Sequence, residues 1–398
     1  MLTVSEARAR ILAAINALPA EAVPLDAAVG RVLARPAVAE RDQPPFDRVT
    51  MDGIALRFDE YAALERSFPI QATQLAGAPP LELDAGHCIE IMTGAALPGC
   101  ADLVIPVERV TVNNGAAHVE ANYMAEQRQY VHPQGSDYRQ GKQLLGIGTR
   151  IRPMEIAVLA SCGLASVDVA RQPVVTVIST GDELVPAGQS IAPEQIRLSN
   201  GPAIVAMLRE HGYTSCHHDH LRDDKAELRE RIAAHLDASD ALILSGGVSR
   251  GKADYVPEIL ADLGVAVDFH RISQRPGKPM WFGMGPGGQA VFALPGNPVS
   301  TLVCCRQYVI PALDKASGEL PPAQRFANLS EDVSFTPNLT CFLPVRVVTS
   351  AAGQSVALPV PTNTSGDFAA LAGTYGYVEL AMSESLFRAG TTVPLTRW

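Results

Sequence analysis

The chain has 398 residues, of which 47% are hydrophobic and 19% charged, and its formal net charge is −10 at pH 7. This composition is typical of a folded globular protein and excludes a disordered chain, and the length predicts roughly two to four domains. The negative charge disfavours nucleic acid as a partner, because binding to a phosphate backbone requires a basic surface. A local basic pocket can still hold a small anion.

The cysteine pattern and the N-terminal residues both bear on the expected cellular compartment. Seven cysteines are scattered along the chain, and none forms a CxxC pair. An odd number without pairing favours reduced thiols in a cytosol over a disulfide framework. The sequence has no apolar run of about 18 residues, and residues 1–8 lack the apolar core of a secretion signal. We therefore expect a cytoplasmic protein without a membrane segment.

The first part of the chain combines a helix with short β-like segments. Thr3 and Glu6 have capping-box spacing, which predicts a helix just after them. Between residues 23 and 137, short β-like runs alternate with Pro and Gly, as in a small β-rich domain. We assign residues 1–22 and 138–172 to a discontinuous N-terminal or hinge domain, and 23–137 to the β-rich domain.

Residues 173–318 have the texture of an α/β domain. Strand-like runs at 174–178 and from Ala241 alternate with helical patterns at 200–208 and 225–236. This alternation predicts a parallel, doubly wound sheet, whose ligands bind beyond the carboxyl ends of its strands. Loops 179–183 and 245–247 both follow strands, so we expect them to meet at that edge.

The last 80 residues or so differ again in pattern. Pro321 and Pro322 indicate a linker, and β-like runs follow at 342–348 and 377–380. These short runs predict a small β-barrel over residues 319–398. The chain is therefore expected to be an α/β multidomain protein with a β-rich insertion and a C-terminal barrel.

The loop over residues 245–252 is the strongest candidate for a ligand site. It reads Ser-Gly-Gly-Val-Ser-Arg-Gly-Lys between a predicted strand and a predicted helix, an arrangement that holds phosphate. The loop nearly matches a Walker A motif, but Ala253 stands where a hydroxyl would bind Mg²⁺. Asp254 follows and offers a carboxylate to a cation instead. The alternative is a glycine-rich turn without a ligand.

Three other features have both a functional and a structural interpretation. Residues 216–220 are Cys-His-His-Asp-His, but neighbours in a strand face opposite sides, which disfavours a metal cluster. Cys304 and Cys305 fit a buried helix better than a redox pair. Trp281 and Phe282 could cover a flat ring of a ligand, although packing in a buried strand is the simpler interpretation.

Six segments occur together in a specific order: Met51-Asp52-Gly53, Thr93-Gly94-Ala95, Ser179-Thr180-Gly181-Asp182-Glu183-Leu184, Ser245-Gly246-Gly247-Val248-Ser249, Pro276-Gly277-Lys278-Pro279 and Leu294-Pro295-Gly296-Asn297-Pro298. Each alone is typical of a turn. In this order, the chain resembles the molybdenum insertases of molybdenum-cofactor biosynthesis, the MoeA and gephyrin E-domain family. The resemblance covers essentially the whole chain.

The resemblance implies an enzyme, a molybdopterin molybdotransferase. Such an enzyme inserts molybdate, its second substrate, into adenylylated molybdopterin and releases AMP, with Mg²⁺ as cofactor. It also implies a homodimer, with each active site between the α/β domain of one subunit and the β-rich domain of its partner. The molybdopterin adenylyltransferase of the same pathway is a further expected partner. The alternative function is that of a divergent paralogue or scaffold, which binds the molybdopterin nucleotide without efficient metal insertion.

The resemblance also implies roles for particular residues. Five acids are implied to be catalytic, of which the last three are also candidate Mg²⁺ ligands: Asp52, Asp137, Glu183, Asp223 and Asp254. Pyrophosphate and molybdate are anions and require N–H groups and cations. The implied substrate-binding residues are Ser245, Gly246, Gly247, Ser249, Gly251, Arg271, Arg275, Gly277, Lys278, Pro295, Asn297, Arg346 and Ser365.

Some positions depart from the family pattern. Arg271 and Arg275 stand where many relatives carry Lys. The positive charge is kept, but a compact ammonium group is replaced by a planar guanidinium group. Arg250 replaces an apolar residue, and either adds a phosphate contact or is only a surface charge. Residues 132–137 lack the usual arginines beside Asp137, and residues 364–367 match the family loosely.

Overall fold

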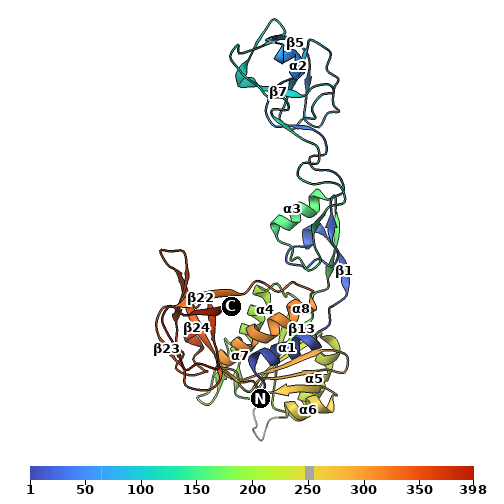
Figure 1. The fold of residues 1–398 in the computed structure, drawn as a ribbon. Coiled ribbons are helices and arrows are strands. Elements are labelled where there is room, and N and C mark those ends of the chain that lie inside the picture. The colour runs from blue at the N-terminus through green and yellow to red at the C-terminus, as the bar shows by residue number, and fades with distance from the viewer. Residues whose placement is uncertain (64, 247–254) are drawn as a thin grey trace. The chain divides into compact units, whose positions relative to one another are not determined.

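A computed structural model describes residues 1–63, 65–246 and 255–398. These residues form two compact units. The large unit comprises Met1–Ala34, Ile147–Arg152 and Val167–Trp398, and the small unit comprises Arg35–Gly146 and Pro153–Ser166 (Figure 1). In the described part of the chain, no helix is long and apolar enough to cross a membrane. The finer division into four domains stays a prediction.

A six-stranded sheet forms the centre of the large unit. Its strands, in spatial order, are β16 (Cys216–Leu221), β13 (Val175–Thr180), β17 (Ala241–Ser245), β21 (Ala290–Leu294), β20 (Trp281–Met284) and β18 (Ala266–His270). Two hydrophobic cores cover its two faces, because successive side chains of a strand point to opposite sides. Val177 belongs to one core and Ile178 to the other. The sheet is thus doubly wound, as predicted.

Helices lie on both faces of this sheet. One face is covered by α1 (Val4–Ala14), α4 (Asn200–Glu210), α7 (Pro298–Cys304) and α8 (Ile310–Ala316), and the other by α5 (Lys225–Ala238) and α6 (Val256–Asp262) (Figure 1). The predicted capping box opens α1: the Thr3 N–H donates to the Glu6 carboxylate over 2.8 Å, and the Glu6 N–H donates to Thr3 Oγ1. Residues 305–309 continue α7 as a π-helical turn, η3 (Cys305–Val309), before α8 begins.

The sheet is only partly parallel, which corrects one expectation. Strands β16, β13, β17 and β21 are parallel, whereas β20 pairs antiparallel with both β21 and β18. The reason is the short turn between β20 and β21, in which the Gly285 N–H donates to the Gln289 carbonyl over 2.8 Å. A parallel connection needs a crossover of about a dozen residues, which this segment lacks.

The C-terminal strands close into the predicted barrel. Its five strands are β24 (Thr340–Thr349), β25 (Ser355–Pro359), β22 (Arg325–Leu329), β28 (Thr392–Arg397) and β26 (Gly376–Leu380), and β26 pairs back with β24. The short strand β19 (Gln274–Arg275) of the α/β part pairs with β24. The α/β part and the barrel are therefore joined by strand pairing as well as by the chain.

The small unit is β-rich, as predicted. Its six-stranded sheet has the order β7 (Leu103–Pro106), β4 (Gly53–Leu56), β6 (Cys88–Ile91), β5 (Ser67–Gln74), β9 (Ala116–Val119) and β8 (Val110–Asn113). Asn114 and Gly115 both have positive φ in the turn between β8 and β9, which is the hairpin chemistry of an Asn-Gly pair. Gly53 lies so close to β7 that a Cβ there would be 1.9 Å from the Ile105 carbonyl oxygen.

The remaining elements are short. They are β1 (Ala20–Pro24), η1 (Leu25–Ala27), β2 (Ala37–Val38), β3 (Arg48–Val49), α2 (Phe58–Ala62), η2 (Val107–Arg109), β10 (Val131–His132), β11 (Gln143–Leu145), α3 (Pro153–Ser161), β12 (Ser166–Ala170), β14 (Leu184–Val185), β15 (Ile196–Arg197), β23 (Val333–Ser334), η4 (Phe368–Leu371) and β27 (Leu386–Phe387).

The close approach at Gly53 makes a testable prediction for the small unit. Gly53→Ala forces a methyl group into a backbone carbonyl that cannot move aside, so the local stability of the sheet should fall by about 3 kcal/mol. Hydrogen exchange of peptides covering β4 and β7 measures this loss. Gly146→Ala is the control, because its Cβ would meet only the flexible Gln143 side chain at 3.4 Å. Equal protection in the two variants would contradict the packing described.

Candidate functional site

The loops after β13 and β16 lie together at the carboxyl edge of the parallel strands. The predicted meeting of loops 179–183 and 245–247 is seen where Thr180 lies against Gly246. The His220 ring lies with Nε2 3.0 Å from the Gly181 carbonyl, and the Asp223 N–H donates to the Asp182 carboxylate over 3.3 Å. Glu183 folds back over Gly181, where a Cβ would lie 2.5 Å from its carboxylate. The two predicted metal ligands Glu183 and Asp223 are thereby carried by adjoining loops.

The side chain of Asn200 joins the other loops of this edge. Its Nδ2 lies 2.9 Å from Ser245 Oγ, 2.8 Å from the Gly296 carbonyl and 3.3 Å from Thr301 Oγ1. One amide therefore links the end of β17, the loop after β21 and helix α7. In the sequence, Asn200 was identified only as the first residue of a predicted helix. Its polar side chain was the one feature that could have suggested a role in the site.

Two buried polar atoms beside these loops lack hydrogen-bond partners among the residues that the structure describes. They are Thr180 Oγ1 and Asn200 Oδ1. Thr180 lies against Gly246, where a Cβ would be 2.8 Å from the Thr180 carbonyl and 3.3 Å from its Oγ1. An unsatisfied buried polar group costs about 1–3 kcal/mol, so two of them at one edge indicate a site that receives a polar ligand.

A basic turn packs against the same helix α7. Arg271, Arg275 and Lys278 are exposed and form no ion pair with any described residue. Gly277, with φ +91°, presses onto this helix: a Cβ there would lie 2.4 Å from Cys304 Sγ and 3.7 Å from the Ser300 carbonyl. The turn thus presents three uncompensated cations close to α7, which suits a polyanion.

The loop before α7 also contacts the barrel. Asn297 Nδ2 donates to Ser365 Oγ over 2.7 Å, and the Val299 N–H donates to the Ser365 carbonyl over 3.0 Å. Pro295 accepts a hydrogen bond from the Thr301 hydroxyl, which closes the first turn of the helix. Arg346 lies on the exposed side of β24, opposite Leu358, and makes no hydrogen bond to another described residue.

Asp52 is held by the second family motif of the small unit. Its Oδ1 accepts hydrogen bonds from the Thr93 N–H at 2.6 Å and the Thr93 hydroxyl at 2.7 Å. These bonds, the side-chain bond first, lower the pKa of the Asp52 carboxyl. Gly94, with φ +85°, completes the turn by donating its N–H to the Val49 carbonyl over 2.8 Å. Asp52 is therefore an oriented carboxylate that is ionised at neutral pH.

Asp137 is contacted by a histidine in the segment that lacks the family's usual arginines. His132 Nε2 lies 3.0 Å from Asp137 Oδ1, and His132 Nδ1 lies 3.2 Å from Arg48 Nη2. Arginine only donates hydrogen bonds, so Nδ1 must accept, and the ring proton must sit on Nε2 and point to Asp137. The His132 ring thus orients this carboxylate through its Nε2–H.

The strand that carries Cys216 to His220 divides its side chains between two faces. The His217 ring lies 5.9 Å from the His235 ring of α5, whereas His218 lies against Gly201 of α4. In the described ranges, no group of three His, Cys, Asp or Glu side chains could hold a metal ion. Trp281, Phe282, Cys304 and Cys305 are buried, as the packing interpretation expects.

Part of the predicted site lies outside the described residues. The members concerned are Gly247, Ser249, Gly251 and Asp254, together with Arg250 and Ala253. Their roles stay predictions. The described members divide into two groups: those at the strand edge of the large unit, and Asp52 and Asp137 in the small unit.

Comparisons with known families cover nearly the entire chain. Residues 2–163 match the family model described as "MoeA N-terminal region (domain I and II)". Residues 176–315 match "Probable molybdopterin binding domain", and residues 327–398 match "MoeA C-terminal region (domain IV)".

Individual relatives agree with these matches. A Synechocystis protein named molybdopterin molybdenumtransferase is 39% identical over 377 residues, which cover 94% of each chain. A protein of the same name from Synechococcus elongatus is 32% identical and covers 99% of this chain and 98% of its own length. The crystal structure of a molybdopterin biosynthesis MoeA protein from Pyrococcus horikosii has a TM-score of 0.84 at 31% identity, covering 100% of this chain and 99% of its own.

The histidine bridge predicts a spectroscopic result. In nitrogen-15 NMR spectra of the histidine-labelled chain, the His132 ring should carry its proton on Nε2 at neutral pH, and His132→Gln identifies the signal. Arg48→Met removes the donor to Nδ1 and should let the two tautomers mix. Arg139→Met is the control, because Arg139 pairs with Asp42 in the same unit. A protonated Nδ1 in the unmodified chain would refute the assignment.

Proposed function

This chain belongs to the MoeA family, and we propose that it inserts molybdate into adenylylated molybdopterin with release of AMP. The family relationship makes it a transferase of molybdenum-cofactor biosynthesis, with molybdopterin and molybdate as substrates. The observation that supports the finer proposal is the strand edge with two unsatisfied buried polar atoms, close to a helix against which a turn with three exposed, unpaired cations packs. That combination fits a pyrophosphate-linked, anionic substrate.

The large unit would bind the pyrophosphate and the molybdate. Ser245 and the Gly246 backbone end the strand that precedes the predicted phosphate loop, and Arg275 and Lys278 offer charge to the phosphates. Ser365 Oγ accepts its bond from Asn297, so its own O–H remains available to donate to an oxyanion. Arg346 is the proposed cation for molybdate.

Mg²⁺ fits the acidic loops of the same edge. Glu183 is exposed and its carboxylate makes no hydrogen bond to another described residue, while Asp223 lies on the adjoining loop. Carboxylate oxygens are the donors that a hard cation prefers, so Glu183 and Asp223 would hold the ion together with Asp254. When bound, Mg²⁺ would neutralise negative charge on the pyrophosphate.

The acids of the small unit would serve the reacting end of the substrate. Asp52 keeps Oδ2 free of hydrogen bonds to described residues while Oδ1 is fixed by Thr93. An ionised, oriented carboxylate of this kind can accept a proton, and we assign Asp52 and Asp137 to proton transfer.

The assembly that would combine the two groups of residues is a homodimer with two-fold symmetry. Two-fold symmetry gives two equal composite sites, each with the strand edge of one chain and Asp52 of its partner. The molybdopterin adenylyltransferase is a proposed partner in substrate delivery. A cytoplasmic location is also proposed, and it is supported by seven free cysteines, of which six are buried.

AMP release tests the proposed function. The purified chain, incubated with adenylylated molybdopterin, Mg²⁺ and molybdate, should release AMP, and removal of Mg²⁺ by chelation should stop the release. Glu183→Ala should lower the rate at limiting Mg²⁺ and recover when Mg²⁺ is raised, because the variant loses one ligand of the ion. Asp182→Asn is a neighbouring control that keeps Glu183. Tight substrate binding without AMP release would favour the alternative, a paralogue or scaffold that does not insert metal efficiently.

Arg275 supplies a second, quantitative prediction. Arg275→Ala removes a guanidinium without an ion-pair partner in the described chain, so substrate affinity should fall by about 1.5–3 kcal/mol, the scale of a charge-assisted hydrogen bond. Calorimetry at physiological salt measures it. Arg388→Ala is the matched control, since Arg388 pairs with Asp332 on the barrel surface. Unchanged affinity for the Arg275 variant would exclude this residue from the phosphate site.

A further inference from the structure

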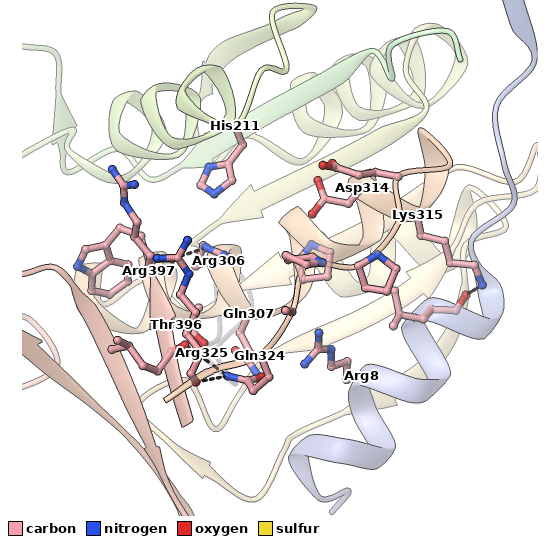
Figure 2. A pocket seen from close by; sticks show the side chains of 18 of the residues that line it. Arg8, His211, Arg306, Gln307, Asp314, Lys315, Gln324, Arg325, Thr396 and Arg397 are labelled. Carbon is pink, nitrogen blue, oxygen red and sulfur yellow. Dashed lines mark hydrogen bonds between the residues drawn. The ribbon is translucent and has the colours of Figure 1, made fainter. Parts of the chain in front are cut away.

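A cavity of about 660 Å³ opens in the large unit (Figure 2). Its walls come from α1, the end of α4, η3, α8, the linker at residues 321–324 and the end of β28. Helix α4 begins with Asn200 at the strand edge and ends with Glu210 in this cavity. Eleven helical residues span about 16 Å, so the cavity is separate from the proposed active site.

Four arginines line this cavity: Arg8, Arg306, Arg325 and Arg397. None of them forms an ion pair with a carboxylate of the described residues. Arg306 Nε donates to the Arg397 carbonyl over 2.7 Å, and Arg325 donates to the Tyr375 hydroxyl over 3.0 Å. Arg8 is exposed and makes no hydrogen bond to another described residue. The four guanidinium groups thus line the cavity without a direct ion pair to a described carboxylate.

The acidic side chains that line the cavity are either bonded to other residues or exposed to solvent. Glu319 binds Arg150, whose Nε donates to Glu319 Oε1 over 2.7 Å. Asp314 accepts a hydrogen bond from the Tyr213 hydroxyl, and burial raises the pKa of this carboxyl to about 6. Glu210 is exposed at the end of α4. These contacts leave the arginine side of the cavity positive.

The rest of the wall is partly polar and partly apolar. The polar part is formed by His211, Gln307, Lys315, Gln324 and Thr396, and the apolar part by Leu12, Pro311, Pro321, Pro322, Ala323, Leu395 and Trp398. Proline and aliphatic side chains offer no hydrogen bonds, so they select an apolar body rather than a hydrated inorganic ion. The volume is in the range of about 300–1,000 Å³ that is typical of small-molecule sites.

We propose that this cavity binds a small organic anion, with carboxylate or phosphate groups on the arginines and an apolar body against the proline-rich wall. Guanidinium groups bind both kinds of oxyanion through paired N–H donors, and an apolar wall with a few charged groups is the usual make-up of such sites. The ligand is distinct from the proposed substrate, which would bind at the strand edge.

The probe for this proposal is benzene-1,3,5-tricarboxylate, a rigid aromatic ring with three carboxylates. Calorimetry should detect one binding site per chain, with an affinity that falls as salt is raised. Arg8→Gln and Arg306→Gln should each weaken binding about tenfold, the effect of one charge-assisted hydrogen bond. Arg10→Gln is the control, because Arg10 lies on the same helix but pairs with Asp268 outside the cavity.

Three results would overturn the proposal. They are no binding at millimolar probe, equal weakening by Arg8→Gln and Arg10→Gln, and loss of binding in Arg275→Ala, which would place the probe at the strand edge. Because Arg8 is exposed and unbonded, Arg8→Gln should fold normally, and its thermal unfolding provides the check.

Discussion

The side-chain amide of Asn200 is the contact on which the strand edge depends. Parallel strands bring their carboxyl ends to one side of a sheet, but they do not fix the loops that follow. Asn200 does so by bonding to Ser245 Oγ and the Gly296 carbonyl. Through the neighbouring Asn297, the same network reaches Ser365 of the barrel. The end of β17, the loop before α7 and the barrel loop are therefore positioned together.

The small unit uses a different device to fix its acids. Asp52 is oriented by a hydroxyl and an N–H of one residue, and Asp137 by a histidine whose tautomer an arginine sets. Both arrangements hold a carboxylate without burying it, so the charge costs little and stays available to a substrate. The proposed reaction needs both kinds of group, a binding site for an anion and oriented acids. In that proposal the large unit would bind a polyanion with cations and N–H groups, and the small unit would supply the acids.

The features that were predicted correctly from the sequence are those that depend on residues close together in the chain. The capping box of α1, the doubly wound sheet and the barrel follow from patterns that act over a few residues, as at Thr3. The antiparallel direction of β20 was missed because a short turn replaces the crossover that a parallel connection needs. Asn200 and His132 were missed because their partners lie 45 to 101 and 5 to 84 residues away in the chain, and no pattern in the sequence measures such contacts.

The central claim is that the strand edge of one chain and Asp52 of another form one active site. Its most direct test mixes two variants that are each expected to be inactive, Asp52→Ala and Asp254→Ala, and measures AMP release. In a mixed dimer, one site carries both defects and the other carries neither. A random mixture contains about half mixed dimers, so activity should approach about a quarter of the unmodified value if the sites are independent. If mass-labelled chains demonstrably exchange and no activity returns, the site is built within a single chain.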